Sequence, residues 1–323
     1  MTFRAYAQPV ALALLLASAD AAAQANYPTK PIRMIVPFAP GGGTDITARA
    51  VAIRLGESWG QTVVPDNRPG ANGTIGVDFA SKAAPDGYTI CMISSSHSVN
   101  VALYPKLPYD LLKDLTAITQ LTSQPYAMII HPSVPAKSVK EFIAYARSKP
   151  GAINYGSSGT GGIAHLGGAW LGSIAGISMV HVPYKGGALA LTDMIAGQIQ
   201  MQLGTLTLSG PHIKAGRLRA LAVTTPKRWP GTPELPPMQE AGVPGFSITQ
   251  WYGLITSAKT PRPLIIKLNK EIARILQLPD VKEKMAADGA DAVGNTPEEF
   301  NAHIRSEVAK YGKLVKEIGL KAD

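Results

Sequence analysis

Short apolar segments alternate with helical patterns along most of this chain, and this alternation constrains its fold more than any other feature. Strand-like runs at 32–38, 62–65 and 88–93 alternate with helical patterns at 44–58 and 73–83. A second series has strand-like runs at 127–130, 153–155, 179–182, 200–203 and 218–223 and helical patterns at 139–148, 163–174 and 188–196. Such alternation is typical of α/β folds with largely parallel sheets.

The two series predict two lobes, because a chain of 323 residues exceeds what one compact core usually needs. We expect residues 26–124 and 251–323 to form the first lobe and residues 125–250 the second. The proline-rich stretch 225–244 is expected to be irregular. A strand at 251–256 and two helical segments should close the chain, and the last of these begins with a capping box at Thr296 and Glu299.

The first 25 residues have the pattern of a secretory signal peptide. Arg4 precedes an apolar run at 10–17 and a small-residue stretch at 21–25. Cleavage after Ala23 or Ala25 would leave an exported mature chain. No later window approaches the 18 uninterrupted apolar residues of a membrane span, so we expect no membrane insertion of the mature chain.

Charge and composition exclude several classes of function. The formal net charge is +9, but the basic residues are scattered and aromatic residues make up only 7%. A nucleic-acid binder usually concentrates both, so a diffuse field that favours small anions fits better. The single cysteine, Cys91, lies in an apolar run and predicts a buried thiol without a disulfide. The six histidines show no metal-binding spacing.

Two glycine-rich loops fall short of nucleotide-binding motifs. The loop VPFAPGGGTD at 36–45 has no lysine after its glycines, and a dinucleotide fingerprint would require glycine or alanine where Ile46 stands. In YGSSGTGGIAHL, Gly159, Gly161 and Ala164 fit Gly-x-Gly-x-x-Ala. The ribose-binding acid is missing, because no Asp or Glu occurs between Glu141 and Asp193. We therefore expect no nucleotide cofactor.

The second loop also approaches the nucleophile elbow of a hydrolase. Gly-x-Ser-x-Gly from Gly156 requires glycine where Thr160 stands. Ser158, His165 and Asp193 could still form a triad in a secreted serine hydrolase. His165 falls one or two turns into the following helix, which favours a packed or hydrogen-bonded histidine.

One arrangement recurs: a strand, a loop of Gly, Ser and Thr, and then the start of a helix. It occurs at 41–45, 68–74, 94–97, 157–162 and 183–187. Such loops expose backbone N–H groups at the positive end of a helix dipole, and glycine lets an anion approach closely. Several converging loops could bind a carboxylate without a catalytic residue. Asp45 lies at the start of a helix, where the helix dipole favours an acidic side chain. Contact with a ligand is the second explanation for this residue.

The order of these motifs resembles the Bug/TctC family of periplasmic substrate-binding proteins of tripartite tricarboxylate transporters. The resemblance is carried by YPTKPIRMIVPFAPGGGTDITAR, VVPDNRPGANGTIG, INYGSSGTGGIAHL and HVPYKGGALALTDMIAGQI, and covers nearly all of the mature chain. It implies two α/β lobes in a Venus-flytrap fold with two crossovers. It implies ligand-binding residues at Gly41, Gly42, Gly43, Thr44, Asp45, Ser157, Ser158, Gly159, Thr160, Gly161, Tyr184, Lys185, Gly186 and Gly187. Asn72 and Thr74 stand where many members carry smaller or different residues, and we expect Asn72 to contact the ligand. Ser95, Ser96 and Thr205 are expected to line the remaining wall and to vary with the substrate.

The resemblance predicts a monomeric, non-catalytic binding protein that holds a small organic carboxylate between its lobes and presents it to membrane transporter components. Closure is expected to bend the chain near 124–125 and 250–251. No cofactor, metal or nucleic acid is expected. The alternatives are a secreted serine hydrolase and a sensor that binds the same ligand and docks to a signalling receptor.

Overall fold

The computed structural model describes residues 26–287 and 289–321, and the predicted signal peptide at 1–25 lies outside the described residues. The first elements are β1 (Ile32–Val36), α2 (Gly43–Trp59), β2 (Val63–Asn67), η1 (Ala71–Gly73), α3 (Thr74–Ser81), β3 (Thr89–Ser94), α4 (Ser95–Leu103) and β4 (Leu115–Ile130). Next come α5 (Val139–Ser148), β5 (Ile153–Ser157), α6 (Ile163–Ala175), β6 (Met179–Pro183), α7 (Gly187–Ile195), β7 (Met201–Thr205), α8 (Leu206–Lys214) and β8 (Arg219–Val223). The chain closes with β9 (Thr249–Ser257), α9 (Arg262–Leu276), α10 (Pro279–Ala287), β10 (Asp291–Ala292) and α11 (Pro297–Glu317).

The strands follow the order β2-β1-β3-β9-β4-β7-β5-β6, with β8 and β10 also paired to β4. β1 pairs in parallel with β2 and β3, and β5 pairs in parallel with β6 and β7. The long strands β4 and β9 run antiparallel to each other and to their neighbours. The predicted parallel pairing therefore holds within each end of the sheet, and the two central strands interrupt it.

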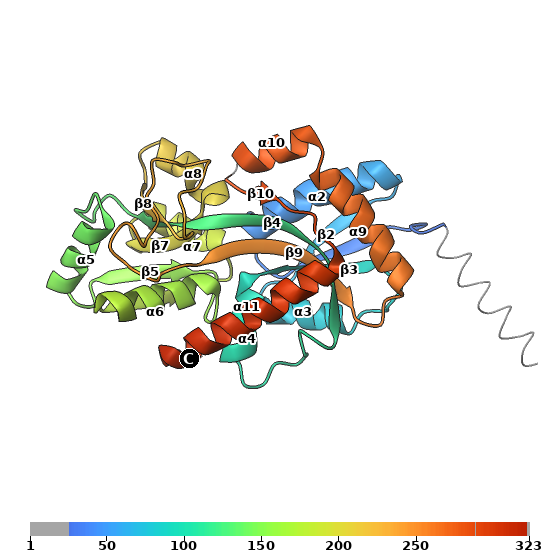
Figure 1. The fold of residues 1–323 in the computed structure, drawn as a ribbon, viewed down its shortest axis with the longest axis horizontal. Helices are drawn as coiled ribbons and strands as arrows, with labels where there is room; N and C mark the ends of the chain where they lie inside the picture. The colour runs from blue at the N-terminus through green and yellow to red at the C-terminus, as the bar shows by residue number, and fades with distance from the viewer. Residues whose placement is uncertain (1–25, 288, 322–323) are drawn as a thin grey trace, which may run out of the picture.

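The elements gather into two lobes that β4 and β9 connect (Figure 1). We call the elements around β1, β2 and β3 the first lobe, and those around β5, β6, β7 and β8 the second lobe. This arrangement confirms the predicted two-lobed α/β fold with two crossovers. The proposed residue boundaries of the lobes stay a prediction.

Two helices pack against both lobes. The core of the second lobe includes Val99 and Leu103 from α4, and Tyr311 and Leu314 from α11. Both helices were expected within the first lobe, and α11 also anchors there, because the Trp251 indole Nε1 donates to the Glu307 carboxylate at 3.1 Å. The helices α4 and α11 therefore form a second connection between the lobes, beside the central strands.

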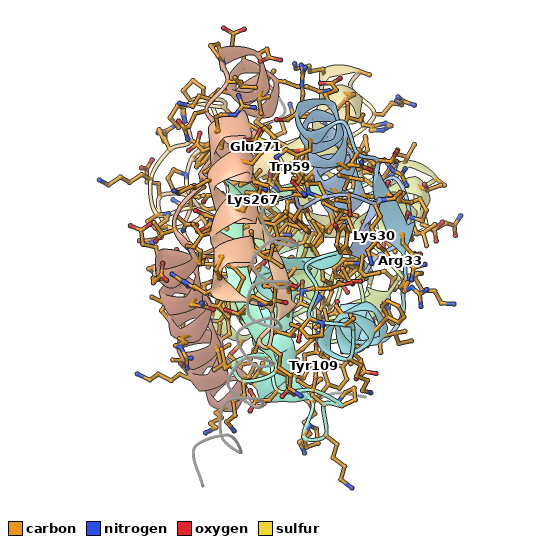
Figure 2. The ribbon with its side chains drawn as sticks, turned by 90° about the vertical axis from the view of Figure 1, so that its right-hand side faces the viewer. Lys30, Arg33, Trp59, Tyr109, Lys267 and Glu271 are labelled. Carbon is orange, nitrogen blue, oxygen red and sulfur yellow. The ribbon has the colours of Figure 1, made fainter. Side chains whose placement is uncertain are left out.

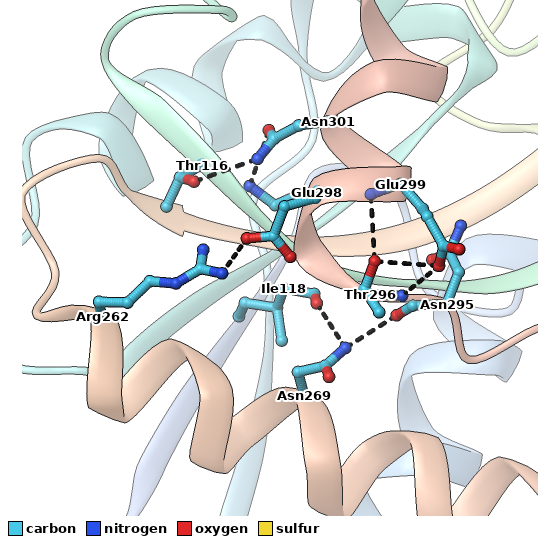
Figure 3. Close-up of polar contacts among 10 residues, drawn as sticks. Thr116, Ile118, Arg262, Asn269, Asn295, Thr296, Glu298, Glu299 and Asn301 are labelled. Atoms are coloured by element: carbon cyan, nitrogen blue, oxygen red, sulfur yellow. Dashed lines mark hydrogen bonds and ion pairs between the residues drawn. The ribbon is translucent and has the colours of Figure 1, made fainter.

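The start of α11 is fixed as the capping box predicts (Figure 3). The Glu299 N–H donates to Thr296 Oγ1 at 3.2 Å, and the Thr296 N–H donates to Glu299 Oε2 at 2.8 Å. Beside it, the Asn269 amide of α9 donates to the carbonyl oxygens of Ile118 and Asn295 at 2.9 and 2.8 Å. These contacts attach α9 and the turn before α11 to β4.

The two predicted bending points lie opposite each other in the sheet. Gln124 pairs with Gln250, and Pro125 pairs with Thr249, where β4 and β9 cross between the lobes. Because both crossings share this position, a change of backbone angles here would move one lobe against the other.

Several elements differ from the sequence prediction. β4 was expected at 127–130 but begins at Leu115, and α8 was not expected. Residues 94–97, expected as a loop, form the N-cap and first turn of α4. The chain closes with three helices rather than two. The stretch 225–244 contains no helix or strand in the described chain, as predicted.

The edge of the first lobe is lined by charged side chains. Arg33 and Arg68 both contact Asp66 of the edge strand β2, at 3.6 and 2.9 Å, and both guanidinium groups lie over the Phe79 ring. Figure 2 shows Arg33 and Lys30 at this side of the molecule. Such charges protect an edge strand from pairing with another chain. Among the described residues, no helix is long and apolar enough to span a bilayer.

Candidate functional site

A narrow cavity of about 50 Å³ lies between the lobes, beside the central strands. We call it the inner compartment. It is lined by Phe38, Gly42, Gly43, Thr44, Ser94, Ser96, Tyr126, Ser158, Ala164, Gly187, Gln202, Leu203, Gly204, Thr205, Leu208, Gln250 and Tyr252. These side chains are polar or apolar, and none of them is charged. An ion bound here would therefore be stabilised by dipoles and hydrogen bonds rather than by a salt bridge.

Four helices begin at the inner compartment, and one of them, α4, is capped by Ser94 and His97. The N-cap residues of α2, α7 and α8 are Gly42, Gly186 and Thr205, and none of them caps its helix through a side chain. The first N–H groups of a helix have no partner within the helix, and the dipole makes this end positive. The fold thus brings together positive helix ends from both lobes at a cavity that has no acidic side chain.

The helix α6 also begins at the cleft, but its N-terminus is already occupied. The Ile163 N–H donates to Ser96 Oγ of the first lobe at 3.1 Å. Two further hydrogen bonds cross the cleft, from the Ala39 N–H to the Lys185 carbonyl at 3.2 Å and from the Tyr104 hydroxyl to the Thr160 carbonyl at 2.7 Å. The lobes therefore contact each other directly in this structure.

Asp45 holds the first glycine loop from behind. Its carboxylate accepts hydrogen bonds from the Gly41 N–H, the Arg49 guanidinium and the Asn67 amide, each at 2.9 Å. Burial raises the pKa of Asp45, but these hydrogen bonds outweigh that effect and keep its pKa below the usual value. Asp45 does not line the inner compartment, so the structure favours the structural explanation of this residue over ligand contact.

In the first loop, Gly41 and Gly43 are required for different reasons, whereas position 42 tolerates a side chain. Gly41 has a φ of 79°, which disfavours any side chain. A Cβ on Gly43 would lie 2.4 Å from the Tyr252 hydroxyl, so this close approach requires glycine. Gly42 has a φ of −79°, and a Cβ there would meet only the Ala39 carbonyl, at 3.8 Å. A side chain at position 42 is therefore compatible with the fold.

The second loop, at 157–161, is held by a serine and two histidines. Ser157 Oγ accepts from the Gly159 N–H at 3.1 Å and lies 2.7 Å from His181 Nε2. His165 Nδ1 accepts from the Gly161 N–H at 3.1 Å. The two imidazoles stack with their centroids 3.7 Å apart and their planes at 12°. Burial, together with the neighbouring His165, lowers the pKa of His181 to about 3.

A second compartment of about 220 Å³ adjoins the inner one. We call it the outer compartment, and it shares Phe38 and Ser158 with the inner one. It is lined by Phe38, Gly70, Ala71, Asn72, Gly73, Tyr104, Ser158, Gly159, Thr160, Pro183, Tyr184 and Lys185.

The structure distributes the predicted site residues over three positions. Those in the inner compartment are Gly42, Gly43, Thr44, Ser96, Ser158, Gly187 and Thr205. Those in the outer compartment are Asn72, Ser158, Gly159, Thr160, Tyr184 and Lys185. Those that line neither compartment are Gly41, Asp45, Ser95, Ser157, Gly161 and Gly186. Their contact with a ligand stays a prediction.

The sequence analysis missed the parts of the wall that come from strands and their ends. Gln250 and Tyr252 of β9, together with Gln202 of β7 and Tyr126 of β4, line the inner compartment. Gln250 and Tyr252 are two residues apart and so point to the same face of their strand. A polar pair at this spacing in a buried strand is the signal that could have identified them.

The geometry does not support the hydrolase triad. The Asp193 carboxylate accepts from the Tyr184 hydroxyl at 2.7 Å, and His165 is fixed by the Gly161 N–H and by its stacking on His181. The expectation of a packed and hydrogen-bonded His165 is confirmed. In the part of the chain that the structure describes, no group of three acidic, histidine or cysteine side chains could hold a metal. Cys91 is buried, and burial raises the pKa of its thiol.

Two α/β lobes, joined by crossing strands and enclosing a cavity, define the fold of a periplasmic solute-binding protein. The chain belongs to the Bug/TctC family, because residues 47–320 match the family described as "Tripartite tricarboxylate transporter family receptor". This family consists of substrate-binding proteins rather than enzymes, which excludes the serine hydrolase.

Relatives and solved structures agree with this assignment. Protein BugT of Bordetella pertussis is 35% identical over 315 residues, which cover 96% of this chain and 97% of BugT. The structure of R. palustris Rpa4515 with adipate has a TM-score of 0.89 and 35% identity, and covers 91% of this chain and 99% of that one. MatC from Rhodopseudomonas palustris with bound malate has a TM-score of 0.86 and 29% identity, and covers 90% of this chain and 100% of MatC.

Proposed function

We propose that this chain captures a small organic carboxylate between its lobes and presents it to the membrane components of a tripartite tricarboxylate-type transporter. One observation carries the proposal: the uncapped N-termini of α2, α7 and α8, from both lobes, surround a single cavity that has no acidic side chain. Adipate and malate in two similar structures support a carboxylate as the ligand.

The helix termini can supply the affinity that a transport receptor needs. Each terminus contributes about 0.3 to 2 kcal/mol to the binding of an anion, and each hydrogen bond to a charged group about 1.5 to 3 kcal/mol. A few such contacts reach the roughly 8 kcal/mol that corresponds to a micromolar dissociation constant. No catalytic residue is required.

Ligand binding would be coupled to the contact between the lobes. The hydrogen bonds across the cleft, such as Ala39 to Lys185 and Ser96 to Ile163, support a closed state with bending near 124–125 and 250–251. In this proposal the transporter recognises the closed state of a monomer that the N-terminal signal has exported to the periplasm.

A thermal-shift screen tests the proposal. The purified protein is denatured and refolded to remove carried ligand, and is then melted with a panel of mono-, di- and tricarboxylates. A specific acid at 100 times its dissociation constant should stabilise the protein by about 2.7 kcal/mol. If no acid raises the melting temperature, the proposed function is wrong.

Gly42→Val then tests the site. A side chain at position 42 fits the backbone but would cover the N-terminus of α2, so binding should be lost while the fold remains. Gly187→Val applies the same test to the second lobe, because its Cβ would meet only Leu208 and Gln202, at 3.7 and 3.9 Å. Gly210→Val of α8 is the matched control, since a Cβ there meets nothing within 4 Å. Normal binding by Gly42→Val would exclude the first loop from the site.

A further inference from the structure

The outer compartment differs in chemistry from the inner one. The inner compartment has no charged side chain, whereas Lys185 is charged and lines the outer compartment. The two compartments meet at Phe38 and Ser158. A ligand whose one end lies at the helix termini could therefore extend past these two residues into a differently charged environment.

Lys185 is exposed, and its ammonium group pairs with no carboxylate of residues 26–287 and 289–321. Its backbone is nevertheless fixed, because its carbonyl accepts from the Ala39 N–H of the first lobe at 3.2 Å. The adjacent Tyr184 is held as well, by a hydrogen bond from its N–H to the Ser157 carbonyl at 3.1 Å. The contact between the lobes thus places an unpaired positive charge at the wall of the outer compartment.

Asn72 supplies a second, independent observation that points to a ligand in the outer compartment. Its side chain is 6% exposed, and its Oδ1 has no hydrogen-bond partner among the described residues. The orientation of the amide is fixed by its neighbour. Asn100 Nδ2 donates to the Asn72 carbonyl at 3.1 Å, so Asn100 Oδ1 remains to accept from Asn72 Nδ2, at 2.7 Å. A flipped Asn72 would place two oxygens against each other.

The free oxygen of Asn72 faces the second lobe. A Cβ on Gly162 would lie 3.1 Å from Asn72 Oδ1 and 3.0 Å from Ser158 Oγ. Glycine at position 162 therefore leaves these two oxygens without a side chain between them. A buried acceptor without a donor is unfavourable, and a donor from a ligand would satisfy it.

We infer that the outer compartment is a second polar subsite, in which Lys185 binds a distal carboxylate of the ligand and Asn72 accepts a hydrogen bond from a hydroxyl group beside it. This inference rests on the proposed function. It makes Lys185 and Asn72 the residues that determine specificity for hydroxylated dicarboxylates. In an amino acid, a charged ammonium group would take the place of this hydroxyl group. No carboxylate side chain lines either compartment, so the charge of that ammonium group would be left unpaired.

Calorimetric titration of the refolded protein with three acids of four carbons tests this assignment. The probes are butyrate, succinate and malate, which add first the distal carboxylate and then the hydroxyl group. The unaltered protein should bind malate more tightly than succinate, and succinate more tightly than butyrate. Lys185→Gln should weaken succinate and malate by about tenfold, as one charged hydrogen bond predicts, and leave butyrate within about twofold. Lys214→Gln, at an exposed lysine of α8, should change none of the three.

Asn72→Gly tests the hydroxyl contact. Glycine accepts the positive φ of 49° at this position, so the backbone is compatible with the change. The preference for malate over succinate, about threefold to tenfold for one neutral hydrogen bond, should disappear. Because both acids are measured on the same variant, a loss of stability affects them equally and leaves their ratio informative.

Three results would overturn the inference while leaving the proposed function in place: succinate binds no better than butyrate, Lys185→Gln weakens all three acids alike, or Asn72→Gly keeps the preference for malate. Failure of every acid in the wider screen would instead overturn the proposed function, and this inference with it.

Discussion

The two glycine loops that face each other across the cleft have the same position in their lobes but different supports. Each follows the first strand of its lobe's parallel sheet, β1 or β5, and precedes a helix, α2 or α6. The first loop is held by a charged carboxylate, Asp45, paired with Arg49. The second is held by neutral groups, the Ser157 hydroxyl and the stacked imidazoles of His165 and His181. One loop geometry can therefore rest on two kinds of chemistry.

The difference predicts that acid weakens the two supports in different pH ranges. Asp45 has a lowered pKa in the folded state, so its stabilisation is present above the unfolded value and is lost only as the pH falls through the folded pKa, below 3.8. His181 has a pKa of about 3 when folded and the usual 6.5 when unfolded. Between these values the unfolded chain binds more protons, so folding weakens as the pH falls from 6.5 towards 3.

Removal of the charged support should have the largest effect. Asp45→Ala deletes the acceptor for Gly41, Arg49 and Asn67, and hydrogen bonds to a charged group contribute about 1.5 to 3 kcal/mol each. Arg49 can be hydrated, since its side chain is half exposed, so we expect a loss of about 2 to 4 kcal/mol in the free energy of unfolding. Urea denaturation measures it. Glu240→Ala, at an exposed acid paired with Arg228 at 2.9 Å, is the control and should change stability by less than about 0.5 kcal/mol.

An unfolding free energy for Asp45→Ala equal to that of the control would mean that the loop does not depend on its carboxylate. The affinity for the acid found in the screen should fall as well, because the N–H groups of the first loop lose their fixed direction. If Asp45→Ala is destabilised but binds the acid with unchanged affinity, the carboxylate supports the fold and is not needed for the binding site.

The neutral support predicts an intermediate effect that depends on pH. Melting temperatures of the unaltered protein should fall as the pH is lowered from 7 to 4. One histidine contributes at most about 1.4 kcal/mol per pH unit, and His181 less because it is partly exposed. His181→Phe keeps a ring against His165 and removes the titrating group, so its melting temperature should fall less steeply. His97, whose pKa burial lowers to about 4, contributes equally to both proteins and cancels in the comparison. Parallel curves for the two proteins would contradict the assignment to His181.

The sequence predicted the parallel parts of the fold because strands covered by helices on both faces are nearly continuous apolar runs, as in β1 and β3. β4 was predicted only from residue 127 onward. Its first half carries Thr119, Gln120 and Thr122, which are buried although they are polar, and they weaken the apolar pattern. The serines from Ser94 to Ser96 indicated a loop because serine is common in turns, yet Ser94 is an N-cap whose helix follows at once.

The candidate site was predictable where it depends on local backbone and not where it depends on distant strands. The loops around Gly42 and Gly187 follow from glycine between a strand and a helix. The wall formed by Gln202 and Tyr252 depends on the register of β7 and β9 against β4, which joins residues far apart in the sequence. The unpaired oxygen of Asn72 depends on Asn100, which lies on another helix. No local sequence pattern indicates these contacts between residues that are far apart in the chain.

The smallest effect is predicted for a variant of the second loop, and it can be compared directly with the effect of Asp45→Ala in the first loop. Ser157→Ala removes one neutral hydroxyl, which accepts from the Gly159 N–H and contacts His181. A neutral hydrogen bond contributes about 0.5 to 1.5 kcal/mol to stability, so the variant should lose about 1 kcal/mol in urea denaturation, well below the loss for Asp45→Ala. Ser148→Ala, at an exposed serine of α5, is the control. If Ser157→Ala costs as much as Asp45→Ala, the hydroxyl and its two histidines act as one cooperative network, and the neutral support is as strong as the charged one.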